Sequence, residues 1–320
     1  MDIETRNHYE TKLRNLIKYA WEREVDWAEI DAWQKNFNGL VVDKDEEQIY
    51  ALFTLSRFMY FGKRLVREML KSVYREHFRA PIMQRIRRNY SDTLDMELLE
   101  ALYQKELRCT RFIGVGNPAE SGAHLLYFFR QINYLPKDLF VDITGAFIPR
   151  DRNGTFEIEQ REPKVSRYIF FDDLVGSGDQ ATTYLRPFLD VIKKSGRNID
   201  LRFISLFSTS QGLQALNKKD MFNGNASCLF ELDESYKVCG EQSRYFTNAP
   251  SWFKKLTFYQ IFSQYGQTIT PDIPLGYGNS QLLLGFSHNT PDNTLPVFWY
   301  EGKDKAWSPV FIRYDKKYGL

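Results

Sequence analysis

The clearest hydrophobic pattern in the chain is an alternation of short apolar runs with longer amphipathic segments, from residue 111 to about residue 232. The apolar runs are rich in β-branched and aromatic residues, as buried strands are, and they cover 112–116, 139–143, 168–171, 200–207 and 226–232. Segments with apolar residues at helical spacing follow several of these runs, at 123–131, 179–194 and 211–218. Strands that alternate with helices are typical of a doubly wound parallel sheet. We therefore expect an α/β core over residues 111–240.

The regions on either side of this core have different patterns. Residues 1–110 carry apolar positions at helical spacing, which predicts helices at about 9–20, 46–77 and 92–105, with a break at Pro81. Residues 241–320 are aromatic and rich in turn-forming residues, and one short strand is expected there, at 282–286. The sequence thus predicts three regions, namely a helical N-terminal region over 1–110, the α/β core over 111–240 and a C-terminal extension over 241–320.

The composition argues against several classes of protein. The net charge is only +2, so no overall field favours a polyanionic partner. Three widely spaced cysteines cannot form a disulfide framework, and four scattered histidines without a Cys-x-x-Cys pair give no zinc site. The first residues, MDIETRNHYE, are polar and unlike a signal peptide, and no apolar run approaches the ~20 residues that span a bilayer. These features predict a cytoplasmic protein with no membrane partner.

The stretch 164–185 carries the most specific candidate chemistry. Its apolar strand ends in Asp172 and Asp173, and the small-residue turn 176–178 then leads into the polar start of a helix. In open α/β sheets, ligands bind beyond the carboxyl ends of the strands. Glycines let the backbone approach a phosphate, a helix N-terminus supplies free N–H groups, and carboxylates accept sugar hydroxyls or hold a metal through water. The stretch therefore indicates a sugar-phosphate site, with an ordinary buried strand and turn as the alternative.

A similar pattern occurs in the Walker B strand of P-loop enzymes. That class also needs a glycine-rich loop that ends in Gly-Lys followed by Ser or Thr. The Gly-Lys pairs of this chain, at 62–63 and 302–303, are followed by Arg and Asp. The sequence thus disfavours a P-loop enzyme.

Residues 168–180 resemble the PRPP-binding motif of type I phosphoribosyltransferases, in which four apolar, two acidic and two apolar residues precede a short loop rich in Ala, Thr and Gly. The resemblance implies that Asp172 and Asp173 are catalytic, contact the ribose hydroxyls of PRPP or a nucleotide, and hold Mg²⁺ through water. The implied phosphate-binding residues are Val175, Gly176, Ser177, Gly178, Asp179 and Gln180. The family usually has Gly-Thr where this chain has Asp179-Gln180, so a negative charge lies beside the phosphate site.

Two further stretches have a place in the same resemblance. The implied pyrophosphate loop consists of Gly116, Asn117, Pro118, Ala119, Glu120 and Ser121. The polar stretch 144–166, with Arg150 and Arg152, corresponds to the mobile catalytic loop, or hood, that closes over the substrate. Each stretch also has an ordinary interpretation, the first as a routine strand-to-helix connection and the second as surface.

The helical N-terminus and the aromatic tail, with Asn-Thr-Pro at 289–291, are similar to those of the PRTase-CE group. These are phosphoribosyltransferase-like proteins of bacterial conflict and anti-phage gene sets, and some accompany retron reverse transcriptases. The resemblance implies an effector that acts on PRPP or nucleotides at the anomeric carbon of the ribose, with a reverse transcriptase or another defence protein as its partner. Because Asp179-Gln180 replaces Gly-Thr, the alternative is a catalytically inactive sensor or scaffold.

Residues 57–88 are strongly basic. Lys63, Arg67, Lys71 and Arg75 recur at every fourth position, so they follow one broad face of the expected helix. This basic face has two interpretations, a contact with a nucleic-acid backbone or a solvated surface that pairs with acidic residues elsewhere. The sequence leaves both open.

Overall fold

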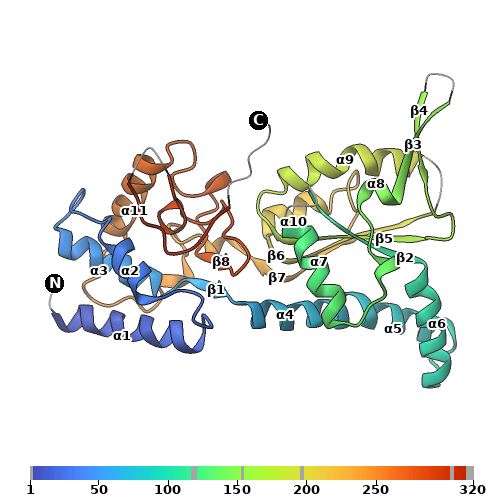
Figure 1. Ribbon diagram of the computed structural model, residues 1–320, viewed down its shortest axis with the longest axis horizontal. Helices are drawn as coiled ribbons and strands as arrows, with labels where there is room; N and C mark the ends of the chain where they lie inside the picture. The colour runs from blue at the N-terminus through green and yellow to red at the C-terminus, as the bar shows by residue number, and fades with distance from the viewer. Residues whose placement is uncertain (1–2, 117–120, 153–154, 195–197, 303–305, 315–320) are drawn as a thin grey trace. The chain divides into compact units, whose positions relative to one another are not determined.

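The structure is a computed structural model that describes residues 3–116, 121–152, 155–194, 198–302 and 306–314 (Figure 1). The chain divides into two compact units, a sheet unit of residues 67–232 and a terminal unit of residues 1–66 together with 233–320. This division differs from the three consecutive regions expected from the sequence. The physical reason is that the N-terminal helices and the C-terminal extension share one hydrophobic core.

The terminal unit is mainly helical and has an aromatic core. Its α-helices and strands are α1 (Ile3–Tyr19), α2 (Trp27–Gln34), α3 (Lys44–Leu55), β1 (Met59–Phe61), α11 (Lys255–Ile269) and β8 (Leu284–Phe286). In the core, the ring of Trp33 stacks on Phe298 with centroids 5.2 Å apart, and Phe37 packs against Phe262 at 5.8 Å. Burial of large aromatic side chains is strongly favourable, so the aromatic residues of the tail help to stabilise this core.

Two short strands join the ends of the terminal unit. β1 pairs with β8 in parallel, with Met59 opposite Leu284. The tail strand expected at 282–286 is thereby confirmed. β1 was not predicted, and it interrupts the helix that the sequence predicted over 46–77.

The sheet unit is built on a four-stranded parallel sheet with the strand order β2-β5-β6-β7. These strands are β2 (Thr110–Gly114), β5 (Arg167–Val175), β6 (Asp200–Thr209) and β7 (Ala226–Leu232). In the centre of the sheet, Ile169 lies opposite Phe112 on one side and Arg202 on the other. The predicted parallel α/β sheet is therefore confirmed.

Helices cover both faces of this sheet. α7 (Ser121–Ile132) packs on one face, where the ring of Phe129 lies 5.2 Å from that of Phe171. α9 (Asp179–Lys194) packs on the other face, where Leu185 shares a buried cluster with Phe170. Because successive residues of a strand point to opposite faces, Phe170 packs against α9 on one face and Phe171 packs against α7 on the other. The sheet is thus doubly wound, as predicted.

The strand predicted at 139–143 is not formed. Phe140 pairs with Phe112 through a single parallel bridge. Asp142 explains the difference, because its carboxylate accepts the N–H of Gly145 and caps a one-turn helix in place of a strand. The elements on either side of this bridge are the 3₁₀ turn η2 (Lys137–Leu139) and α8 (Ile143–Ala146).

The polar stretch 144–166, which the sequence predicted to be a long loop, contains an antiparallel hairpin. Its strands are β3 (Phe147–Arg152) and β4 (Thr155–Gln160), and Figure 1 shows them extending away from the sheet. The turn between them lies outside the described residues. The stretch of the chain that the resemblance implied to be the hood therefore forms a two-stranded hairpin.

The basic segment forms one nearly continuous helical rod. It consists of α4 (Lys63–Ser72), the π-helix η1 (Val73–Arg79) and α5 (Ala80–Asn89), and α6 (Met96–Arg108) follows it. The break predicted at Pro81 was wrong. Proline has no N–H to donate, and it stands just after the change of register in which the N–H of Ala80 bonds to the carbonyl of Arg75. In the part of the chain that the structure describes, no helix is long and apolar enough to cross a membrane.

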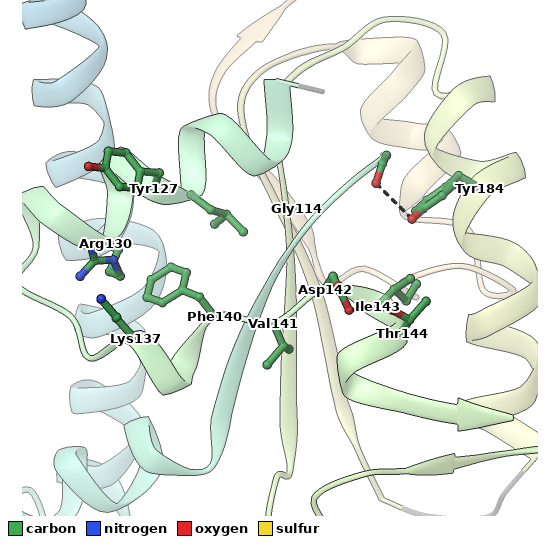
Figure 2. A pocket seen from close by; sticks show the side chains of 12 residues that line it. Gly114, Tyr127, Arg130, Lys137, Phe140, Val141, Asp142, Ile143, Thr144 and Tyr184 are labelled. Carbon is green, nitrogen blue, oxygen red and sulfur yellow. Dashed lines mark hydrogen bonds between the residues drawn. The ribbon is translucent and has the colours of Figure 1, made fainter. Parts of the chain in front are cut away.

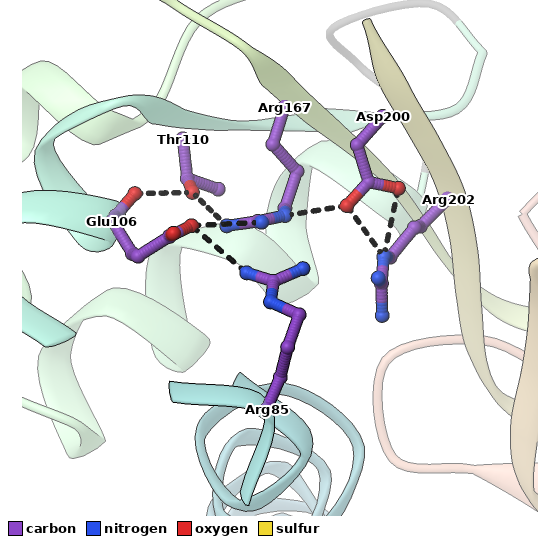
Figure 3. A network of polar contacts seen from close by, with 6 residues as sticks. All are labelled: Arg85, Glu106, Thr110, Arg167, Asp200 and Arg202. Carbon is purple, nitrogen blue, oxygen red and sulfur yellow. Dashed lines mark hydrogen bonds and ion pairs between the residues drawn. The ribbon is translucent and has the colours of Figure 1, made fainter. Parts of the chain in front are cut away.

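Buried charges join the amino ends of the central strands (Figure 3). Arg167 is 4% exposed and donates to the carboxylates of Glu106 at 2.9 Å and Asp200 at 2.8 Å. It also donates to the Thr110 hydroxyl at 3.2 Å, and Arg85 on α5 binds Glu106 at 2.9 Å. This network ties α5 and α6 to the sheet at the edge opposite the carboxyl ends of the strands.

Candidate functional site

The two predicted catalytic carboxylates lie inside β5, close to its carboxyl end. Asp173 is buried, with 8% of its surface exposed, and Asp172 is half-buried. A carboxylate oxygen of Asp173 accepts the N–H of Leu174 at 2.8 Å, and one of Asp172 accepts the N–H of Asp173 at 2.9 Å. Neighbouring side chains of a strand point to opposite faces, so the two carboxylates reach the strand end from different sides.

The predicted phosphate loop is a tight turn between β5 and α9. Val175 at its start is buried, and Gly178 has a φ of +85°, a conformation that favours glycine. A β-carbon on Gly178 would also lie 3.0 Å from the side chain of Ala215. Both the backbone conformation and the close packing therefore favour glycine at this position.

Two residues that the sequence interpretation missed hold this loop in place. The Thr209 hydroxyl donates to the carbonyl of Gly176 at 2.6 Å and accepts the N–H of Gly212 at 3.0 Å. A β-carbon on Gly212 would lie 2.2 Å from the Gly176 carbonyl oxygen. The start of α10 (Ser210–Leu216) therefore packs directly on the loop. A threonine at the end of a strand and before a helix is a usual helix cap, which is the signal that could have identified Thr209.

Asp179 places a carboxylate on the loop. The Ser177 hydroxyl donates to a carboxylate oxygen of Asp179 at 2.7 Å, and the N–H of Asp179 lies 3.3 Å from the same hydroxyl oxygen. Asp179 and Gln180 are both exposed at the start of α9. An acidic residue in the first turn of a helix is favoured by the helix dipole. The carboxylate thus occupies the end of the helix to which an anionic ligand would also be attracted.

The first residue of the predicted pyrophosphate loop lies at the same edge of the sheet. Gly116 has a φ of +92°, and its carbonyl accepts the hydroxyl of Tyr184 on α9 at 3.1 Å. At the start of α7, a β-carbon on Gly122 would lie 2.7 Å from the Val115 carbonyl, so this helix packs tightly against the end of β2. The residues Asn117, Pro118, Ala119 and Glu120 lie outside the described part, as does the side chain of Ser121. The structure therefore brings the beginnings of both predicted loops to one edge of the sheet.

The hairpin in the position of the hood contains one ion pair between described side chains. Arg150 is 58% exposed in its side chain and binds Glu159 on the other strand at 2.9 Å. The side chain of Arg152 lies outside the described residues. Arg150 thus supports the pairing of the two strands.

Each of the four residues of the basic face has a partner. Lys63 binds Glu24 at 3.1 Å, Lys71 binds Glu68 at 2.7 Å, and Arg75 binds Glu76 at 2.6 Å. The guanidinium group of Arg67 lies 5.0 Å from the centre of the Phe128 ring. The three glutamates reduce the charge that the face presents to a polyanion.

The described residues include no cluster of three or more His, Cys, Asp or Glu side chains that could hold a metal. A metal at the acidic pair would therefore take most of its ligands from water and from a bound substrate.

Comparisons with known proteins found a family model that matches this chain and solved structures to which it is similar. The family model PRTase-CE matches residues 30–313. Among solved structures, the chain is similar to an orotate phosphoribosyltransferase from Aeropyrum pernix, with 17% identity, a TM-score of 0.25, and 42% of this chain matched to 66% of that one. It is also similar to the xanthine-guanine-hypoxanthine phosphoribosyltransferase of Helicobacter pylori, with 11% identity, a TM-score of 0.28, and 55% of this chain matched to 86% of that one. The match spans just under two thirds of the first enzyme. A search of curated proteins found no match.

Proposed function

Because the chain belongs to the PRTase-CE family, we propose that its phosphoribosyltransferase-like sheet unit binds PRPP or a nucleotide and acts at the anomeric carbon of the ribose. The observation that carries this proposal is the arrangement at one edge of the sheet. Asp172 and Asp173 lie near the carboxyl end of β5, which ends at Val175 before a glycine turn and the start of α9, and Gly116 follows the carboxyl end of β2, the strand that pairs with β5. This is the edge at which open α/β sheets bind their ligands.

The proposed roles follow from the chemistry of each group. Asp172 and Asp173 accept hydrogen bonds from the ribose hydroxyls and stabilise the positive charge that develops on the ring as the anomeric bond breaks. The backbone N–H groups of residues 176–180 bind the 5′-phosphate. The loop that begins at Gly116 receives the leaving pyrophosphate. The hairpin β3-β4 has the position of the hood along the chain, and in the proposed mechanism it moves to cover the reacting atoms and exclude water.

The carboxylates of Asp172 and Asp173 fit a Mg²⁺ ion that arrives bound to the substrate. Two carboxylates at one strand end, without a third nearby acidic, cysteine or histidine ligand among the described residues, suit an ion bound mostly by pyrophosphate and water. When bound, Mg²⁺ would neutralise the charge of the leaving pyrophosphate.

A ribosyl-phosphate sensor without turnover is the second candidate, and Asp179 is the observation that favours it. Its carboxylate bonds to Ser177 within the phosphate loop, so it opposes the anion that this loop would bind. A sensor needs only enough affinity to report the ligand, whereas an enzyme must also hold the phosphate while the anomeric bond breaks. A scaffold of this kind would bind nucleic acid through the basic face, although the glutamate partners of Lys63, Lys71 and Arg75 weaken that interaction.

The resemblance to conflict proteins supports a further proposal about the role of the protein in the cell. We propose that the protein acts in the cytoplasm in anti-phage defence, with a reverse transcriptase or another defence protein as its partner. Bacteria that carry the complete gene set with Asp172→Asn and Asp173→Asn should lose protection against phage if the ribosyl-phosphate site is the effector. Full protection in these cells would exclude that role for the site.

The double variant Asp172→Asn with Asp173→Asn is also the direct test of the activity. Asparagine keeps the shape and the carbonyl oxygen that accepts the backbone N–H, so the fold should survive while the negative charges are lost. We expect release of pyrophosphate from PRPP in the presence of Mg²⁺ to fall at least a hundredfold, as is common when charge stabilisation of a transition state is removed. Asp92→Asn, an exposed change in the same unit, is the control.

The outcomes separate the two candidates. Unchanged pyrophosphate release in the double variant contradicts the enzyme. Calorimetric binding of PRPP to the wild type, without release of pyrophosphate or base and with loss of binding in the double variant, supports the sensor. Wild-type protein that binds neither PRPP nor a 5′-nucleotide contradicts both.

A further inference from the structure

A cavity of about 420 Å³ opens beside the carboxyl end of β2 (Figure 2). Its walls come from α7, from the segment 137–144 and from Tyr184 on α9. Among the described residues that line it, neither Asp172 nor Asp173 is present, and no residue of the loop 176–180 is present. The cavity is large enough for a small ligand and uses side chains other than those of the proposed ribosyl-phosphate site.

Two cations line one end of this cavity. Figure 2 shows Arg130 of α7 and Lys137 of η2 beside Phe140, with Tyr127 close by. Neither cation pairs with a carboxylate of the described residues, and the guanidinium group of Arg130 lies 5.8 Å from the centre of the Tyr127 ring. Arg186, on α9 of the same unit, does have such a partner. Because no carboxylate of the described residues neutralises these two cations, this end of the cavity is positively charged and favours a negatively charged ligand.

The neighbouring wall is apolar and partly aromatic. Phe140 stacks on Phe112 with centroids 5.3 Å apart and an angle of 22° between the rings, and it is only partly buried. Leu126 and Ile143 are buried beneath the same cavity, with 7% and 6% of their surface exposed. A wall of this kind favours a flat ring, since aromatic groups gain by stacking as well as by burial.

We propose that this cavity binds a planar aromatic anion of about the size of a nucleotide. Arg130 and Lys137 hold its negative group through charge-assisted hydrogen bonds, and its ring lies against Phe140. The carboxylate of Asp142 also lines the cavity, but it accepts the Thr144 hydroxyl at 2.9 Å and caps α8. Asp142 is therefore already engaged, and Figure 2 shows it across the cavity from Arg130 and Lys137, so the cation end keeps its positive charge.

The cavity also touches the predicted pyrophosphate loop. Gly116 and Tyr184 both line it, and the hydrogen bond between them is visible in Figure 2. A ligand in the cavity would thus contact the first residue of that loop. The two sites are neighbours, although their charged side chains are different.

The experiment uses 3′-AMP as the probe and adenosine as its neutral counterpart. 3′-AMP is an aromatic anion of the right size, but it has no 5′-phosphate for the loop 176–180, and its 3′-phosphate would be repelled by Asp172 and Asp173. Binding is measured by calorimetry on the full chain. We expect 3′-AMP to bind the wild type at least tenfold more tightly than adenosine.

Variants assign the binding to the cavity. Arg130→Gln with Lys137→Gln should weaken 3′-AMP at least tenfold and leave adenosine nearly unchanged, and Phe140→Leu should weaken both. The matched control is Arg88→Gln with Lys105→Gln, which removes two exposed cations elsewhere in the unit and should change neither affinity.

Three results would overturn the proposal. One is the absence of measurable 3′-AMP binding to the wild type. Another is an unchanged affinity when Arg130 and Lys137 are both replaced, with circular dichroism confirming the fold. The third is loss of 3′-AMP binding in Asp172→Asn with Asp173→Asn, because this would assign the ligand to the acidic pair. Retained binding in that double variant supports a separate site, whatever the fate of the ribosyl-phosphate proposal.

Discussion

Asp179 is the residue that most affects whether the proposed site can bind a phosphate. Its carboxylate is held by the Ser177 hydroxyl, on the loop whose N–H groups would bind a phosphate. Two unit charges of the same sign at ~4 Å repel by about 4 kcal/mol at an effective dielectric of 20. A phosphate could bind beside Asp179 only if the carboxylate turns away or if a cation lies between the two groups.

We therefore predict that Asp179→Gly with Gln180→Thr, which restores the pair usual in the family, tightens the binding of PRPP or a 5′-nucleotide. Removal of the repulsion should improve affinity by about tenfold or more, since tenfold corresponds to about 1.4 kcal/mol. The measurement is calorimetric affinity in the presence of Mg²⁺. Glu97→Gln, which removes an acidic residue from the first turn of α6 instead, is the control. Looser or equal binding in the double variant would show that Asp179 does not oppose the ligand.

The residues of the candidate site differ in how far the sequence could identify them. Asp172 and Asp173 stand next to one another in a short motif, so adjacency alone marked them. Thr209 supports the same loop from 33 positions away, and Tyr184 reaches Gly116 across 68 positions. Such contacts depend on which strands become neighbours, which a local pattern does not specify.

At the scale of elements, the long apolar runs were predictable and the short or capped ones were not. The runs that became β5 and β6 form central strands of the sheet, and each has partners on both sides. The run at 139–143 has similar composition, but the capping carboxylate of Asp142 favours a helical turn over a strand. Pro81 was interpreted by its general tendency to break helices, whereas the π-helical register before it removes the conflict.

The basic face is a property of one helical element, and we predict that it does not bind nucleic acid strongly. Because Lys63, Lys71 and Arg75 already pair with glutamates, few phosphates should be neutralised. Each phosphate contact contributes a slope of about 0.7 to 0.9 in log K against log salt, so we expect a slope below about 1 for DNA and RNA. The measurement is a filter-binding or anisotropy titration at several salt concentrations.

The comparison needs a variant and a control. Neutralising Lys63, Arg67, Lys71 and Arg75 together to glutamine should leave the slope unchanged, as should Lys218→Gln with Lys219→Gln elsewhere on the surface. A slope of several units in the wild type that disappears only in the first variant would establish the basic face as a nucleic-acid surface.

At the scale of the whole molecule, the division into two units arises from contacts between the chain ends. The indole N–H of Trp33 donates to the carbonyl of Val297 at 2.7 Å, across 264 positions. β1 has only 3 residues, too few to stand out in a hydrophobic pattern, and although a strand was expected where β8 forms, its pairing with β1 was not. The sequence therefore indicated what the N-terminal region and the tail are made of, but the way they combine depends on packing between distant segments.

Stability of the sheet unit towards acid should depend on the network around Arg167. Burial alone would raise the pKa of Asp200, but the hydrogen bonds from Arg202 and Arg167 outweigh it and hold the pKa below its ordinary value. Because this pKa is lower in the folded chain than in the unfolded chain, Asp200 stabilises the fold above about pH 4. That contribution is lost as the pH falls through the folded-state pKa.

We predict that Asp200→Asn reduces the sensitivity of the protein to acid. The variant should be less stable than the wild type at pH 6, because Arg167 and Arg202 lose a charged partner, and the difference should shrink between pH 4 and pH 2. Since one pKa unit corresponds to about 1.4 kcal/mol, and the side chain is partly exposed, we expect the difference to change by on the order of 1 kcal/mol. Urea unfolding across this pH range measures it, and Asp138→Asn, an exposed change in the same unit, is the control. A stability difference that stays constant with pH would show that Asp200 acts through its shape and hydrogen bonds and that its charge contributes nothing.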